Sequence, residues 1–132
     1  MPAAERPSLP FAYAVLRVVP QVERGERLNV GVVLFCRQLD FLELRAELDA
    51  GRLAALAPEL DPAPVRSRLD ALCEVVAGAP AGGAVARLPK SERFGWIVAP
   101  SSTSIQPSEV HAGLTSDPAA TLERLFGRLV SV

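Results

Sequence analysis

Two almost wholly apolar runs, joined by one polar connection, constrain the fold of this chain more than any other feature. The first run covers Ala12 to Val19 and is interrupted only by Arg17, and the second covers Asn29 to Cys36. Runs that are apolar at successive positions are typical of strands buried on both faces. The sequence therefore predicts two central strands of a sheet, joined by a hairpin from Gln21 to Leu28 that turns at Gly25.

A third strand is predicted from Phe41 to Leu48, where apolar and polar residues alternate with the period of a strand that has one solvated face. The connection from Arg37 to Asp40 is short enough for a tight hairpin, which favours an antiparallel meander of the three strands. Further strands are predicted at Gly95 to Ala99 and around Ile105 and Gln106.

Three helical segments carry capping residues and an apolar stripe. A short helix follows Asp49, a longer one runs from Asp61 to Gly78, and the last follows Asp117 near the end of the chain. The elements together predict an α+β fold, with an antiparallel sheet of four to five strands and about three helices packed mainly on one face.

The length of 132 residues fits one domain, which we assign to residues 11–132 after a flexible, proline-rich tail at residues 1–10. Hydrophobic residues make up 49% of the chain, enough to form a core, so disorder is not expected. Apolar runs stay far below the roughly 20 residues of a membrane helix, and the first residues do not form a signal peptide pattern. We expect a cytoplasmic protein.

The cysteines and the net charge argue against several classes of site. Cys36 and Cys73 lack CxxC spacing and a neighbouring histidine, so we expect two small buried hydrophobic residues, no metal site and no cofactor. The net charge is −1, and basic residues are scattered among acidic ones. A dedicated nucleic-acid binder would carry a basic stripe, so nucleic-acid binding remains only as a local patch formed on folding.

The most polar segment runs from Ser101 to Gly113 and contains the candidate binding residues Ser102, Thr103, Gln106 and His111, the last being the only histidine. Such groups can converge on a ligand or partner, or they can satisfy the backbone of a solvated connection. A hydrolytic triad of a nucleophile, His111 and either Asp117 or Glu109 is a weaker alternative, because the sequence has no GxSxG elbow to present a serine.

Two further groups of residues offer binding chemistry. Glu26 and Asn29 lie just before the second strand, where charges near a turn are usually solvated. Arg17, inside an apolar strand, must reach water or find a partner, for which Glu26 is a candidate. Arg93 and Trp96 combine a charge with aromatic surface, as a base-stacking or interface site would, although the aromatics alternatively belong to the core.

Several blocks of the sequence resemble one bacterial family over about residues 12 to 130. The blocks are Tyr13 to Pro20, Glu23 to Cys36, Ser91 to Trp96, Ser102 to Gln106, Val110 to Leu114 and Leu122 to Phe126. Together they resemble the family catalogued as domain of unknown function three-zero-three-seven. The family has no established activity, and its members are small proteins often encoded beside HipA-like kinases. The resemblance thus implies a HipA-like kinase as a protein partner.

The leading hypothesis is an uncharacterised, non-enzymatic interaction or adaptor domain that partners a HipA-like kinase. The alternatives are a small hydrolase or nucleic-acid-processing enzyme that uses His111, and a nucleic-acid-binding module. No residue is assigned a catalytic role, and the oligomeric state is not defined by the sequence. The candidate binding residues are Arg17, Glu26, Asn29, Arg93, Ser102, Thr103, Gln106 and His111.

Overall fold

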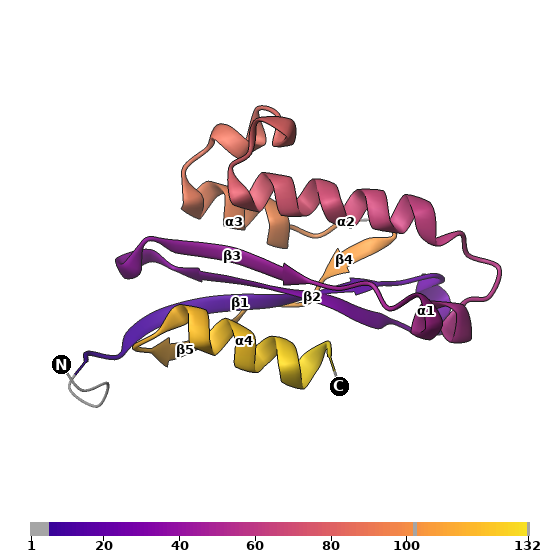
Figure 1. Ribbon diagram of the computed structural model, residues 1–132, viewed down its shortest axis with the longest axis horizontal. Coiled ribbons are helices and arrows are strands. Elements are labelled where there is room, and N and C mark those ends of the chain that lie inside the picture. The colour runs from indigo at the N-terminus through magenta and orange to yellow at the C-terminus, as the bar shows by residue number, and fades with distance from the viewer. Residues whose placement is uncertain (1–5, 102, 132) are drawn as a thin grey trace.

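Strand β1 (Leu9–Val18) is the centre of the sheet in the computed structural model, which describes residues 6–101 and 103–131 (Figure 1). It pairs antiparallel with β2 (Leu28–Cys36), which pairs antiparallel with β3 (Phe41–Ala46). The predicted meander is therefore confirmed. The other edge of β1 pairs with two short strands, β4 (Ile105–Pro107) and β5 (His111–Thr115), which share the fourth position of the sheet.

Ser108 joins β4 and β5 into one interrupted edge strand. Gln106 is opposite Arg17 and His111 is opposite Tyr13, so the register shifts by one residue between the two short strands. At this shift the backbone N–H of Ser108 donates to the carbonyl of Val15 at 2.7 Å, and the Ser108 hydroxyl accepts from the N–H of Val15 at 2.8 Å. Both polar backbone groups of Val15 are therefore satisfied where regular pairing is interrupted.

One face of the sheet is covered by α2 (Pro62–Ala77) and α3 (Lys90–Val98), with α1 (Ala50–Leu56) at one end (Figure 1). The core beneath these helices contains Leu16 and Val33 from the central strands. The helices contribute apolar residues at helical spacing, namely Leu53, Val65, Leu69, Leu72, Val75, Val76, Phe94 and Ile97.

The opposite face is covered by α4 (Pro118–Leu129), whereas α1, α2 and α3 lie on the first face, so the helices are packed mainly on one face as predicted (Figure 1). Val32 and Leu34 of β2 point away from α2 and form a second core with Leu122 and Phe126 of α4. A strand that is apolar on both faces needs a cover on both sides, because each exposed apolar face would cost free energy in water. The described residues form four α-helices instead of about three, and the α+β class is confirmed.

The segment predicted as a strand at Gly95 to Ala99 belongs to α3, so this prediction is wrong. Phe94 and Ile97 are both buried and lie three residues apart, which is a helical spacing. The apolar run is too short for its periodicity to distinguish a helix from a strand. By contrast, the predicted strand around Ile105 is present as β4.

The predicted caps and turns lie where the sequence placed them. The carboxylates of Asp49, Asp61 and Asp117 each accept a hydrogen bond from a backbone N–H of the following helix, at 3.0, 3.0 and 3.2 Å. Gly25 in the first hairpin and Gly78 after α2 have positive φ angles of 71°.

Leu9 and Pro10 belong to β1, so the prediction of a flexible tail over residues 1–10 does not hold for these two residues. Residues 1–5 lie outside the described residues. Among the residues that the structure describes, none of the helices has both the length and the apolar character that crossing a bilayer requires.

Replacing Ser108 with alanine is expected to lower the free energy of unfolding by about 1–3 kcal/mol, because the buried N–H of Val15 loses its acceptor. Urea denaturation followed by circular dichroism measures this loss. Ser104→Ala is the control, since Ser104 is exposed in the same segment. Equal stability of the two variants would contradict the role given to the Ser108 hydroxyl.

Candidate functional site

The two polar segments predicted from the sequence meet on either side of Arg17. Arg17 is opposite Asn29 on β2 and opposite Gln106 on β4. Directly opposite residues project from the same face of a sheet, so the three side chains form a row on the face that α4 covers in part. Tyr13 and His111 are opposite each other on the same face, with ring centroids 5.2 Å apart.

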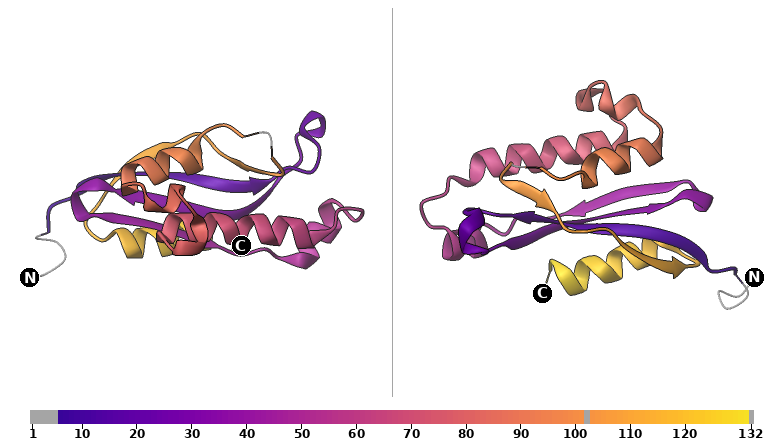
Figure 2. Two further views of the ribbon diagram at one scale, coloured as in Figure 1. Left: turned by 90° about the horizontal axis from the view of Figure 1, so that it is seen from above. Right: turned by 180° about the vertical axis from the view of Figure 1, so that it is seen from behind.

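Helix α4 packs on β2 and β3, while the part of this face formed by β1, β4 and β5 lies beside it (Figure 2). We call this part the Arg17 surface and define it by Tyr13, Arg17, Gln106, Glu109 and His111. Glu109 and His111 are exposed, and the other three are half-buried. Tyr13 and Arg17 are four residues apart, a span of roughly 13 Å along a strand. The arrangement suits an extended contact better than a small-molecule pocket.

Arg17 is the electrostatic centre of this surface. Partial burial lowers the pKa of its guanidinium, Arg27 lowers this pKa further, and Glu109 opposes both effects. An arginine remains protonated in proteins, so a partly desolvated positive charge persists. Its Nε is buried and has no hydrogen-bond partner among the described residues. The described chain therefore leaves the hydrogen bonding of this guanidinium incomplete.

Asn29, at the border of this surface, forms a hydrogen bond with the end of α4. Its Nδ2 donates to the carbonyl of Leu129 at 2.9 Å, and Nη1 of Arg52 donates to the carbonyl of Val130 at 2.9 Å. The carbonyls at a helix C-terminus have no partner within the helix, so both side chains close the end of α4. Sequence reasoning missed Arg52, which lies 78 residues from Val130 and has no local signal.

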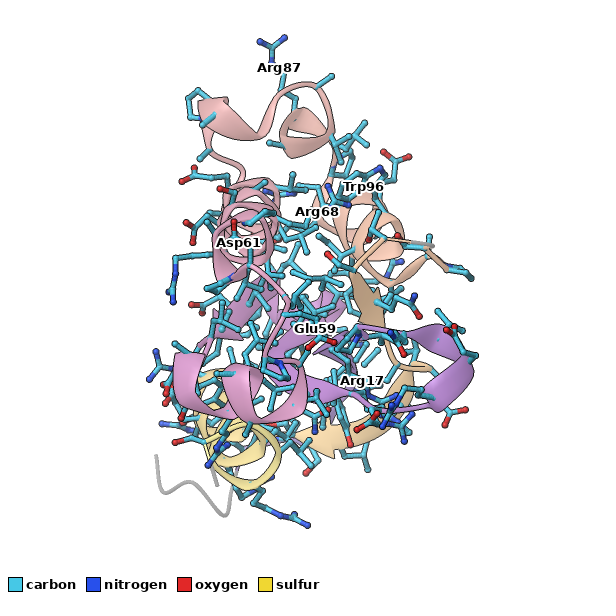
Figure 3. All side chains as sticks on the ribbon, turned by 90° about the vertical axis from the view of Figure 1, so that its right-hand side faces the viewer. Arg17, Glu59, Asp61, Arg68, Arg87 and Trp96 are labelled. Carbon is cyan, nitrogen blue, oxygen red and sulfur yellow. The ribbon has the colours of Figure 1, made fainter. Side chains whose placement is uncertain are left out.

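Arg93 and Trp96 are not on a common surface. Arg93 is buried, and its Nη1 donates to the carbonyl of Val76 at 3.2 Å, near the C-terminus of α2. Trp96 is 41% exposed, and the guanidinium of Arg68 lies 5.9 Å from its ring centroid (Figure 3). The predicted combination of a charge and aromatic surface is therefore provided by Arg68 and Trp96, with Arg93 inside the fold.

Glu26 and Thr103 make local contacts. Glu26 forms an exposed ion pair with Arg24 of the same hairpin loop. The hydroxyl of Thr103 donates to the carbonyl of Ile105 at 2.8 Å, and Nε2 of Gln106 donates to the carbonyl of Thr103 at 3.3 Å. Thr103 thus satisfies backbone groups of its own connection. Ser102 lies outside the described residues.

His111 is an exposed residue of β5. Its ring lies against Tyr13, and none of the five main surface pockets in the described chain is lined by His111. The carboxylate of Asp117, a partner in the triad considered above, caps α4 instead. Within residues 6–101 and 103–131, no three histidine, cysteine, aspartate or glutamate side chains come together in a group that could hold a metal ion.

Both cysteines are free thiols. Cys36 is buried, and its Sγ donates to the carbonyl of Pro10 at 3.4 Å. Cys73 is half-buried on α2, and burial raises the pKa of its thiol, with further contributions from Asp70 and Glu74. The raised pKa disfavours the thiolate, which is the reactive form.

Cys73 is therefore expected to react more slowly with a disulfide reagent at neutral pH than the thiol of an unstructured peptide. The kinetics of thiol labelling, compared with those of Cys73→Ser, measure its rate. Replacing Asp70 with asparagine and Glu74 with glutamine should speed labelling, because the thiolate then loses two repulsive charges. A rate equal to that of the free peptide in the wild type would contradict the shift.

Gly78 and Gly25 provide a matched test of the position of Arg93. Both glycines have φ of 71°, but a Cβ on Gly78 would overlap Nη1 of Arg93, whereas a Cβ on Gly25 meets nothing within 4 Å. Gly25→Ala should cost about 1–2 kcal/mol of unfolding free energy, for the left-handed backbone alone. Gly78→Ala should cost more, and equal losses in chemical denaturation would contradict the packing of Arg93.

Comparison with known proteins gives one match. The family described as "Protein of unknown function (DUF3037)" matches residues 13–130. No curated protein and no solved structure gives a significant match.

Proposed function

Because the chain belongs to the bacterial DUF3037 family, whose function is unknown, we propose a function from its geometry: it is a non-enzymatic interaction domain that binds a protein partner through the Arg17 surface. The convergence of Arg17, Gln106 and His111 on one side of the sheet carries the proposal. The residues come from separate segments, and α4 leaves them uncovered.

The chemistry of the surface indicates what the partner brings. A half-buried guanidinium favours a carboxylate or carbonyl oxygen opposite Arg17, because charge-assisted hydrogen bonds are stronger than neutral ones. Tyr13 and His111 add aromatic area and hydrogen-bonding groups beside it, a combination found at the energetic centres of protein interfaces. Glu109 restricts the approach, because a partner with a second carboxylate beside it would be repelled.

The proposed partner is a HipA-like kinase, which is the partner that the family resemblance of the sequence blocks implies. The complex would lie in the cytoplasm. Two free cysteines agree with this location, since disulfides seldom persist in a reducing compartment. The role of the chain in such a complex is that of an adaptor or regulator, which contributes binding surface and no catalytic group.

Arg17→Met is expected to weaken binding to the purified kinase of the same host by about tenfold, or about 1.4 kcal/mol. Calorimetry or biolayer interferometry measures the dissociation constants. Methionine keeps most of the side-chain volume and removes the charge, so the unfolding free energy should change by less than about 1 kcal/mol.

Arg66→Met is the matched control, because Arg66 is exposed on α2 on the other side of the sheet. It should bind as the wild type does. Failure of the wild-type chain to form any complex with the kinase would refute this partner. Equal affinities of the two variants would refute the Arg17 surface as the binding site.

A further inference from the structure

The outer edge of β5 has backbone groups that no strand of the described chain pairs. The hydrogen bonds between Ser108 and Val15 direct the polar backbone groups of Val15 toward this edge of β1. Because these groups alternate in direction along a strand, those of Tyr13 also point toward β5, where His111 is its partner. The N–H and carbonyl groups of Ala112 and Leu114 consequently point away from β1.

The other two edge segments are protected against pairing. On β4, Pro107 has no N–H to offer, and the carbonyl of Ile105 accepts the hydroxyl of Thr103 at 2.8 Å. On β3, Glu43 and Arg45 place charges along the edge. Proline and charged residues are the usual means by which proteins prevent strand pairing at an edge.

Strand β5 has no such protection. Its sequence, His-Ala-Gly-Leu-Thr, carries no proline, lysine or carboxylate. Leu114 is 68% exposed and Val110, just before the strand, is 48% exposed, while Ala112 is also exposed. An unpaired edge bordered by exposed apolar side chains is a surface onto which another strand can add.

We propose that β5 is the interface of a homodimer, in which it pairs antiparallel with β5 of a second copy about a twofold axis at Gly113. This register places Ala112 of each copy opposite Leu114 of the other copy. The outward N–H groups of one strand then face the outward carbonyl groups of the other strand. The two residues lie on the same face, so the large leucine covers the small alanine across the axis. The absence of carboxylate and ammonium groups means that two identical strands meet without repulsion.

Identical copies fit this edge better than an arbitrary partner, because the self-complementary register uses both outward residues twice. The Arg17 surface is on the face opposite to the side chains of Ala112 and Leu114, since these alternate with His111. The dimer therefore uses the edge of β5 and the proposed protein partner uses the face that carries Arg17, with His111 at the border of the two. A single five-residue strand buries less than the roughly 1,200 Å² of a standard interface, so the dimer should depend on protein concentration.

Two double variants test the register with the full chain. Ala112→Lys with Leu114→Lys places like charges opposite each other across the axis, whereas Ala112→Glu with Leu114→Lys places opposite charges there. Both variants change the same exposed positions, so the folded monomer should tolerate them equally, as circular dichroism checks.

Sedimentation velocity over a concentration series should show wild-type chain approaching twice the 14.0 kDa chain mass. The Glu/Lys variant should dimerise with a dissociation constant at least about tenfold below that of the Lys/Lys variant, and added salt should reduce the difference. A wild-type chain that stays monomeric at all soluble concentrations would overturn the proposal. Equal association of the two variants would overturn it as well, because the interface would then lie elsewhere.

Discussion

Pairing of β1 on both of its edges is the constraint on which the rest of the structure depends. A strand with neighbours on either side has its backbone groups satisfied within the sheet, and its side chains then project from two faces that both need a cover. In this chain α2 and α3 cover one face and α4 covers part of the other, where Phe11 of β1 joins its core. Polar side chains gather on the remaining part of this face, around Arg17, Gln106 and His111, because they cost little free energy when they remain in contact with water.

Arg17 shows how the sheet concentrates polar chemistry. Its neighbours Asn29 and Gln106 are 12 and 89 residues away along the chain, and antiparallel pairing places them on either side of it. The row is not uniform in function, since Asn29 is used to close the end of α4. Gln106 supports its own connection while it remains half-buried on the surface. Arg17 itself makes no side-chain hydrogen bond within the described chain, whereas Arg52 and Arg93 donate to the carbonyls of Val130 and Val76 at the ends of helices.

Local sequence signals predicted the elements that depend on local physics. The three aspartate caps and the hairpin turn at Gly25 follow from backbone geometry within a few residues, and all were confirmed. The prediction failed at α3, because the helical spacing of Phe94 and Ile97 extends over too few residues to distinguish a helix from a strand. It also did not specify that α4 covers the second face, because the apolar stripe of an amphipathic helix does not indicate which face of a sheet it will cover.

For the candidate site, too, the sequence predicted some features and only the tertiary structure decided others. The sequence by itself determined the α+β class, the three-strand meander and the unusual position of a charged residue in an apolar strand, because period and composition act over short distances. Only the tertiary structure decided that Arg17, Gln106 and His111 share one face, that Arg93 is buried and that β5 has an open edge. Register between distant strands depends on packing across the whole core, which no local pattern of residues specifies.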